Sequence, residues 1–239
     1  MRFLRETNHN ADENHFWISI SDLMTSLLFV FILILAYMIL EFQDKSEVAN
    51  KQILAFEKNI NARTELLHNL EKILKKHNIH VEVDKDDGTM RITKEKLFDS
   101  AKAEIRDNKK WIIEGVTDEL LTLMNEPKYQ QAINTIFIEG HTDNVNLNKG
   151  HHGFRWTNME LSSQRAINTF LLMNQHSEGK FSKLRNEKGQ SLISYSGYAA
   201  TRPIKGVLNN SRDGRERNRR IQFFFAVNPP SLEEIKNEL

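Results

Sequence analysis

The chain has 239 residues, a formal net charge of +1 at pH 7 and no cysteine. The absence of cysteine excludes disulfides and thiolate metal sites, and the near-neutral charge gives no global electrostatic reason to expect nucleic-acid binding. The length suffices for one core-forming domain together with a membrane segment and a connector.

Residues 1–16 are polar and lack periodicity, so we expect a short cytoplasmic tail. The following stretch, residues 17–41, is the most apolar part of the chain. From Leu23 to Leu40, eighteen consecutive positions carry no charge, and neither Gly nor Pro interrupts them. About twenty apolar residues, at about 1.5 Å each, cross a hydrocarbon core of about 30 Å, which predicts a transmembrane helix. The stretch is too long for a signal-peptide core and lacks an Ala-x-Ala pattern at its end, which favours an uncleaved anchor.

Asp22 is the single charged residue between Trp17 and Leu40. An ionised carboxylate at the centre of a membrane helix costs roughly 2.5–3.5 kcal/mol. Ser19, Thr25 and Ser26 share its face at helical spacing, which suggests pore-facing polar positions around a proton- or ion-carrying carboxylate. The alternative is that Asp22 lies near the interface, within reach of water, or caps a helix that begins at Leu23.

Residues 42–77 contain no Gly or Pro, and their apolar positions alternate at spacings of three and four. This apolar seam comprises Ile53, Phe56, Ile60, Leu67, Leu70 and Leu74, with Arg63 at the one missing step, and it traces back through Ala49, Ser46 and Phe42 to Ile39. Heptad spacing predicts a helical linker that pairs with a copy of itself. An amphipathic helix that lies on its own domain is the alternative.

Residues 78–228 have the pattern of a folded domain. Alternating apolar residues flank the turn Asp86-Asp87-Gly88 and predict a β-hairpin. Helical periodicity follows over 109–124 and 158–173, and strands are expected over 135–139, 192–196 and 219–227. This order predicts an α/β sandwich, with a mixed sheet that carries helices on one face. Residues 229–239 begin with two prolines and form a charged C-terminal tail.

Three polar blocks stand out within this domain. They are Glu139–Asn144 (EGHTDN), Asn158–Ala166 (NMELSSQRA) and Arg215–Ile221 (RERNRRI). The first follows a strand that ends in Gly, the second opens a helix for which Asn158 is a plausible N-cap, and the third leads into the last strand.

Asp143 and Arg165 have complementary chemistry within the first two blocks. A carboxylate at a strand end can bind an ammonium group, and a guanidinium on the next helix can bind a carboxylate through two parallel hydrogen bonds. The pair is therefore suited to hold a zwitterion.

Other kinds of site have weaker support. His141, His151 and His152 do not match a recognised metal-ligand spacing, so we expect no metal. The arginines of 215–220 are one short run in a neutral chain, and we expect no direct nucleic-acid binding. The sequence contains no nucleophile–base pair and no phosphate-binding loop, so we expect neither enzymatic activity nor a cofactor.

The three blocks together resemble the OmpA-like peptidoglycan-binding domain, with its GHTD loop, its N-x-x-L-S-x-x-R-A helix and the N-R-R before a strand. The resemblance covers residues 78–228 and implies that Asp143 and Arg165 grip the free amino acid group of diaminopimelate in the peptide stem. By the same resemblance, the remaining contacts come from Thr142, Asn158, Leu161 and Arg220. The loop 146–157 is longer than the minimal family pattern.

The N-terminal segment, Trp17…Asp22-Leu-Met24-Thr25-Ser-Leu27, resembles the MotB-type stator subunits of proton-driven rotary motors. That resemblance implies a single-pass inner-membrane protein with a cytoplasmic N-terminus, a periplasmic domain and Asp22 as the proton carrier. It also implies a homodimer surrounded by a MotA-like multi-span subunit, in five copies.

The residues around Asp22 and the short connector are more similar to ZorB, the MotB-like subunit of Zorya antiphage defence, whose partner is of the ZorA type. A flagellar MotB-type stator subunit is one alternative. The other is a passive OmpA-like tether between membrane and wall.

Overall fold

The computed structural model describes residues 9–93, 96–99, 101–145 and 157–229. The described residues divide between two compact units, the first within Met1–Ile53 and the second within Leu54–Ser231. Residues 1–8 of the predicted N-terminal tail, residues 230–239 of the predicted C-terminal tail and residues 146–156 of the loop lie outside the described residues.

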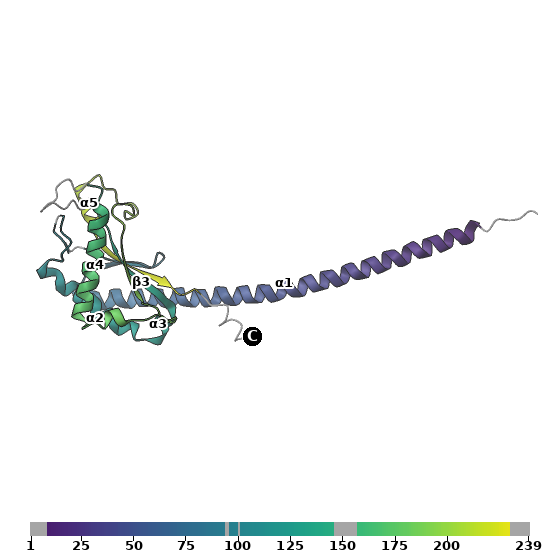
Figure 1. The fold of residues 1–239 in the computed structure, drawn as a ribbon, viewed down its shortest axis with the longest axis horizontal. Helices are drawn as coiled ribbons and strands as arrows, with labels where there is room; N and C mark the ends of the chain where they lie inside the picture. Colours follow the sequence, from purple (N-terminus) through teal and green to yellow (C-terminus); the bar gives the residue numbers. More distant parts are fainter. Residues whose placement is uncertain (1–8, 94–95, 100, 146–156, 230–239) are drawn as a thin grey trace, which may run out of the picture. The chain divides into compact units, whose positions relative to one another are not determined.

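A single α-helix, α1, runs from His9 to Lys76 (Figure 1). No Gly or Pro occurs within it, and Glu41–Lys45 and Glu47–Lys51 form ion pairs at the favourable i, i+4 spacing, with nitrogen–oxygen distances of 2.8 and 3.1 Å. Its N-terminal part is long and apolar enough to cross a membrane, and most of its described large apolar side chains in the first unit are exposed. The predicted apolar helix is therefore present.

The last turns of α1 belong to the core of the second unit. Leu66, Leu67, Leu70 and Leu74 are fully buried there. The compact unit accordingly begins at Leu54, whereas the sequence placed the domain boundary at residue 78. For this part of the helix, the alternative of a helix that lies on its own domain describes what is observed.

Polar contacts fix the same turns. Arg63, at the missing step of the apolar seam, donates hydrogen bonds to the carbonyl oxygens of Lys85 and Asp86 in the turn of the predicted hairpin. Asn69 donates to the Tyr129 hydroxyl at 2.9 Å. The charged residue that interrupts the apolar seam, Arg63, thus connects α1 to the hairpin.

The sheet has five strands in the order β1-β2-β5-β3-β4. They are β1 (Val81–Asp84), β2 (Thr89–Ile92), β3 (Ile133–Gly140), β4 (Ile193–Gly197) and β5 (Ile221–Val227). β3 and β4 are parallel, and the other neighbours are antiparallel. The predicted hairpin and mixed sheet are confirmed.

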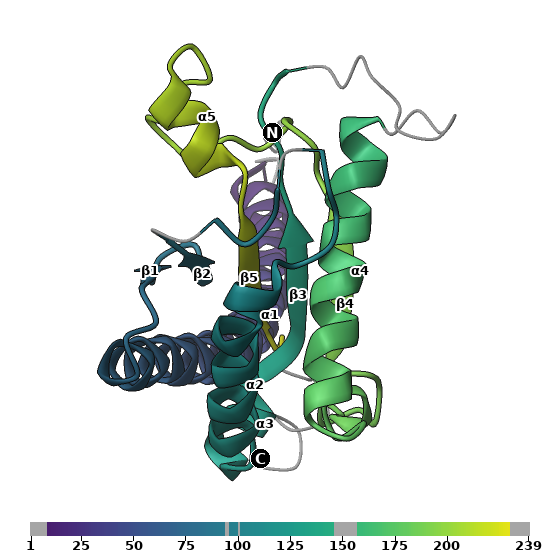
Figure 2. The ribbon, with the colours of Figure 1, turned by 90° about the vertical axis from the view of Figure 1, so that its left-hand side faces the viewer.

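The helices α2 (Lys110–Met124) and α4 (Asn158–His176) lie side by side over the sheet (Figure 2). Ile136 and Ile138 of β3 are fully buried beneath them, whereas Phe137, between them, is half-buried and stacks on Phe224 of β5 at 5.8 Å between ring centroids. This alternation confirms that the apolar layer of helices covers one face.

The sequence missed two short helices, α3 (Pro127–Ala132) and α5 (Arg212–Asn218). Pro127 ends the α2 pattern, as expected, but it also occupies the first turn of α3, where its missing N–H costs nothing. Because α5 takes up the residues before 219, β5 begins at Ile221, slightly later than predicted.

Burial of α1 in the second unit predicts that Leu70→Ala destabilises the domain by about 2–5 kcal/mol, because it removes a fully buried side chain. Leu54→Ala, on the same helix but exposed, is the matched control and should change stability by less than about 0.5 kcal/mol. Urea unfolding of the full-length chain in detergent measures both. Equal, small effects would mean that these turns of α1 do not belong to the domain core.

Candidate functional site

Two glycines let α4 pack directly on the ends of β3 and β4. Gly140 and Gly197 are paired neighbours at the carboxyl ends of these parallel strands. A Cβ on Gly140 would lie 1.9 Å from the carbonyl oxygen of Ser162, and one on Gly197 would lie 2.3 Å from the backbone nitrogen of Ser163. Only glycine permits this approach, which brings the first polar block next to the second.

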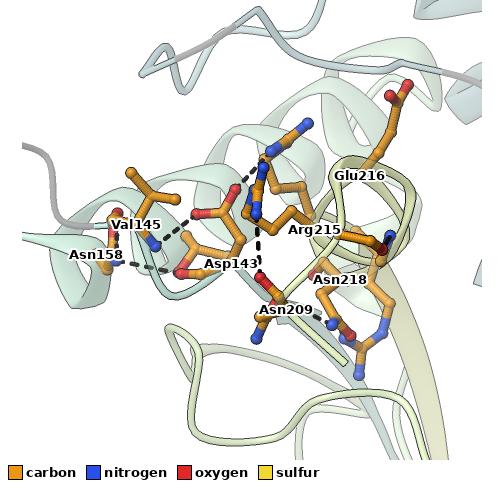
Figure 3. Close-up of polar contacts among 12 residues, drawn as sticks. Asp143, Val145, Asn158, Asn209, Arg215, Glu216 and Asn218 are labelled. Carbon is orange, nitrogen blue, oxygen red and sulfur yellow. Dashed lines mark hydrogen bonds and ion pairs between the residues drawn. The ribbon is translucent and has the colours of Figure 1, made fainter. Parts of the chain in front are cut away.

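The loop after β3 is held by hydrogen bonds from both sides. The Thr142 amide donates to the Ala199 carbonyl at 2.9 Å, and the Thr142 hydroxyl donates to the Asp143 carbonyl at 3.0 Å. The Asn158 side chain donates to the carbonyls of Asp143 and Val145 (Figure 3). Asp143 Oδ1 in turn accepts from the Val145 amide at 3.0 Å, so the carboxylate has a fixed orientation.

Thr157, and not Asn158 as predicted, caps α4. Its hydroxyl accepts from the Glu160 amide, and the Glu160 carboxylate accepts from the Thr157 amide at 2.7 Å, which forms a capping box. These bonds with the Thr157 backbone and hydroxyl lower the pKa of Glu160. Because Thr157 takes the cap, the Asn158 side chain is available to hold the loop.

The charge partner of Asp143 is Arg219, which the sequence motifs did not single out. Arg219 Nη1 donates to Asp143 Oδ2, whereas Arg165 makes no ion pair with Asp143 in the described structure. Arg219 is positioned by α5, which is capped by Ser211 and closed by the fully buried Asn218. The Asn218 side chain accepts a hydrogen bond from the Ile204 amide and donates to the Val207 carbonyl and to Asn209 Oδ1. Arg215 donates to the Asn209 carbonyl (Figure 3).

Arg165 is buried, with 3 % of its surface exposed. Its guanidinium donates to the carbonyls of Lys102 and Asp99 at 3.0 and 3.3 Å and lies 4.8 Å from the centroid of the Phe98 ring. Burial, followed by the charge of Arg219, lowers the pKa of Arg165 to about 10, and Asp143 partly opposes the shift. Arg165 therefore stays cationic at neutral pH without a carboxylate within ion-pair distance among the described residues.

The Arg220 side chain has different hydrogen-bond partners from that of Arg219. It donates to Gln222 Oε1, to the Arg202 carbonyl and to the Asn218 carbonyl, and burial, followed by the charge of Arg91, lowers its pKa to about 10. Consecutive side chains in extended backbone point to opposite sides, which separates the two arginines of the N-R-R block.

A cleft of about 860 Å³ lies between β2, α4 and α5. Of the predicted wall-binding residues, Arg165 and Arg220 line this cleft. The other four lie outside the lining and belong to the loop after β3 and the start of α4: Thr142, Asp143, Asn158 and Leu161. Arg219, which lines the cleft, contacts this group through Asp143. The lining has seven cationic side chains, six of them arginine, against four carboxylates, so the cleft favours anionic groups.

His141 is buried and stacks on Tyr198 at 5.6 Å between ring centroids. Its Nε2 lies 3.5 Å from Glu139 Oε2. Burial lowers the pKa of His141, and Glu139 only partly opposes this. The described residues contain no group of three or more His, Cys, Asp or Glu side chains suited to a metal, and the other two histidines of the metal alternative, 151 and 152, lie outside them.

Asp22 lies within α1, which begins at His9, so the alternative that Asp22 caps a helix starting at Leu23 is wrong. Ser19, Asp22, Thr25 and Ser26 are exposed on the isolated chain. The Thr25 hydroxyl donates to the Ser21 carbonyl at 2.7 Å, which satisfies it inside the helix.

No protein-family model matches the sequence, and no curated protein matches it. Among solved structures, a putative MotB-like protein from Desulfovibrio vulgaris has a TM-score of 0.54 and 19 % identity, covering 73 % of this chain and 96 % of that one. This similarity shows a shared fold.

Two further structures have lower TM-scores. The cell wall anchor of the type VI secretion system from Pseudomonas aeruginosa has a TM-score of 0.45 at 23 % identity over 67 % of this chain and 96 % of that one. The periplasmic domain of a MotB protein has a TM-score of 0.45 at 22 % identity over 63 % of this chain and 68 % of that one.

The lowered pKa of His141 predicts a specific pH dependence of stability. The folded chain holds His141 neutral, so its contribution is present above the ordinary histidine pKa of about 6.5 and is lost as pH falls through that value towards the lower folded pKa. Urea unfolding between pH 7.5 and 5 should show a loss of up to about 1.4 kcal/mol per pH unit from this group.

His141→Gln should flatten that slope, whatever its effect on stability at pH 7.5. His68→Gln, which changes an exposed histidine on α1, is the control and should leave the slope unchanged. A slope identical in the wild type and His141→Gln would contradict the assignment.

Proposed function

We propose that residues 78–228, with the end of α1 that completes their core, bind peptidoglycan through the free amino acid group of diaminopimelate. The observation that carries this proposal is the buried Arg165 guanidinium, which lacks a carboxylate partner in the described structure and lies in a cationic cleft. A ligand carboxylate supplies the missing charge, and a fork-shaped guanidinium binds it in two places.

Asp143 and Arg219 complete the recognition of a zwitterion in this proposal. Each Asp143 oxygen accepts one hydrogen bond in the structure, from Val145 and from Arg219, and retains a lone pair for a ligand ammonium. Arg219 has a side chain that is 37 % exposed, so it can turn towards the ligand carboxylate.

We further propose that the chain is the wall-anchored subunit of an ion-driven motor of the inner membrane, with its N-terminus in the cytoplasm and its domain in the periplasm. The support is a helix able to cross a membrane, with one carboxylate among apolar residues, joined to a fold shared with a MotB-like protein. The exposed part of the apolar seam, from Ile39 to Phe56, pairs with a second copy. The homodimer sits within five copies of a MotA-like subunit.

Asp22 is the proton carrier in this mechanism. Protonation from the periplasm neutralises the carboxylate, and release to the cytoplasm restores its charge, while Ser19, Thr25 and Ser26 line the path. One charge crossing the membrane is worth about 2.3 kcal/mol per 100 mV, which biases each step between a charged, partner-paired state and a neutral one. Attachment to the wall holds the dimer still, so the surrounding ring turns.

The particular motor that we propose is Zorya antiphage defence, with this chain as its ZorB-type subunit and a ZorA-type ring. The support is the sequence Ser19-Ile-Ser-Asp22-Leu23 and the short connector. A flagellar stator subunit and a passive tether are the alternatives. If deletion of the gene abolishes phage resistance but not motility, the result favours the Zorya proposal. The reverse result favours a flagellar stator subunit.

The wall-binding proposal predicts that Asp143→Asn and Arg165→Gln each weaken co-sedimentation of the full-length chain with purified sacculi by at least about tenfold. Each variant removes a charge-assisted hydrogen bond, worth about 1.5–3 kcal/mol. Asp118→Asn, which changes an exposed carboxylate on α2, is the control and should sediment normally. Normal sedimentation of both site variants, with unchanged thermal stability, would refute the pocket.

The motor proposal predicts that Asp22→Asn abolishes proton flow and biological activity, because asparagine cannot exchange a proton. Co-purification with the multi-span partner should persist, because the two side chains have the same shape. Asp44→Asn, on α1 beyond the apolar stretch, serves as the control and should retain proton flow. An active Asp22→Asn variant leaves only the passive tether.

A further inference from the structure

The cleft is larger than the end of one amino acid requires. Its volume of about 860 Å³ falls within the range of sites that enclose whole small molecules, about 300–1,000 Å³. Electrostatic influence groups four of its lining arginines into two pairs, called the first and the second end below: Arg165 with Arg219, and Arg91 of β2 with Arg220, which directly precedes β5. A diaminopimelate end group held by Asp143 and Arg165 therefore leaves the second end unfilled.

Arg91 has the features of an anion-binding side chain that lacks its anion. Its side chain is 12 % exposed, and its one ion pair in the described structure is Glu82, at 3.4 Å. The Nε atom of Arg91 is buried without a hydrogen-bond acceptor among the described residues. A buried donor without a partner costs about 1–3 kcal/mol, which a ligand oxygen would recover.

Arg220 adds a second cation beside Arg91. Its hydrogen bonds all go to neutral oxygens, those of Gln222, Asn218 and Arg202. The two guanidiniums are close enough for the charge of Arg91 to disfavour the charge of Arg220. An anion between them would relieve this repulsion.

Counting charges gives the same balance at both ends of the cleft. At the first end, Arg165, Arg219 and Lys96 face two carboxylates, Asp143 and Glu216, which leaves one positive charge. At the second end, the guanidiniums of Arg91, Arg220 and Arg202 face two carboxylates, Glu82 and Glu139, which also leaves one. His141, which also faces Glu139, is neutral at pH 7. Each end therefore accepts one anionic group.

We propose that the cleft binds two carboxylates of one peptide. The carboxylate of the free amino acid end binds at Arg165, and a second carboxylate binds at Arg91 and Arg220. The inference rests on the proposed wall binding and specifies its ligand. In the peptidoglycan stem, the residue joined to diaminopimelate is a γ-linked D-glutamate, whose α-carboxylate is free. That carboxylate is the group assigned to the second end.

The test is isothermal titration of the full-length chain in detergent with three ligands: meso-diaminopimelate, the tripeptide L-Ala-γ-D-Glu-meso-diaminopimelate, and the same tripeptide with the glutamate α-carboxylate amidated. The wild type should bind the tripeptide about tenfold more tightly than its amidated form, the effect of one charge-assisted contact. Arg91→Gln should lose that tenfold preference and bind diaminopimelate within twofold of the wild type. Arg185→Gln, an exposed arginine outside the cleft, should behave as the wild type.

The outcomes separate the two proposals. A wild type that binds none of the three ligands contradicts wall binding itself. A wild type that binds diaminopimelate but does not distinguish the amidated from the free tripeptide overturns the second subsite and leaves wall binding standing. Equal loss of all three ligands in Arg91→Gln also overturns it, because the effect then acts through the first end or through the fold. Arg91→Lys, which restores a charge, should recover part of the preference.

Discussion

The close approach of α4 to the ends of β3 and β4 is the constraint on which the site depends. Gly140 and Gly197 leave no room for a side chain, so the second turn of the helix, at Ser162 and Ser163, packs directly against the backbone of the strands. Parallel pairing of the two strands puts both loops at one edge of the sheet. As a result, the loop with Asp143 and the helix with Arg165 come together although an eleven-residue segment, 146–156, separates the parts that the structure describes.

Uncompensated positive charge is the second feature of the site. Burying a guanidinium without a carboxylate is expensive, and the chain does so at Arg165 and Arg220 with only backbone carbonyls, an amide oxygen and an aromatic face in contact. Such an arrangement contributes little to folding but prepares the cleft for an anion, because the desolvation cost is met before the ligand arrives.

Patterns with a clear period were predictable. The alternation around Gly88 and along 135–139 gave the hairpin and β3, and the 3.6-residue period gave α2 and α4. The short helix α5 was not predictable, because RDGRERN has no apolar face and depends on the Ser211 cap and on the contacts of Asn218 with a distant loop. Heptad spacing along α1 fits a second helix and a domain core equally well, so the seam alone could not assign Leu66–Leu74 to the core.

Within the site, the sequence identified the residue types but not all the partners. Adjacent arginines diverge in extended backbone, and only the fold shows that Arg219 reaches Asp143 while Arg220 turns to Gln222. Thr157 and Asn158 are both good N-caps, and the glutamate three residues after Thr157 was the signal that distinguishes them. Arg91 belongs to a strand without a motif, and no sequence signal marks it.

The most direct measurement of the central claim is an NMR titration of the full-length chain that follows the Nε–Hε resonances of its arginines as meso-diaminopimelate is added. The account predicts that the Nε–Hε resonances of Arg165 and Arg219 shift in a saturable way as diaminopimelate is added. The same resonances should not shift when cadaverine, a diamine that has no carboxylate, is added. Shifts confined to surface arginines such as Arg185, or none at all, would contradict it.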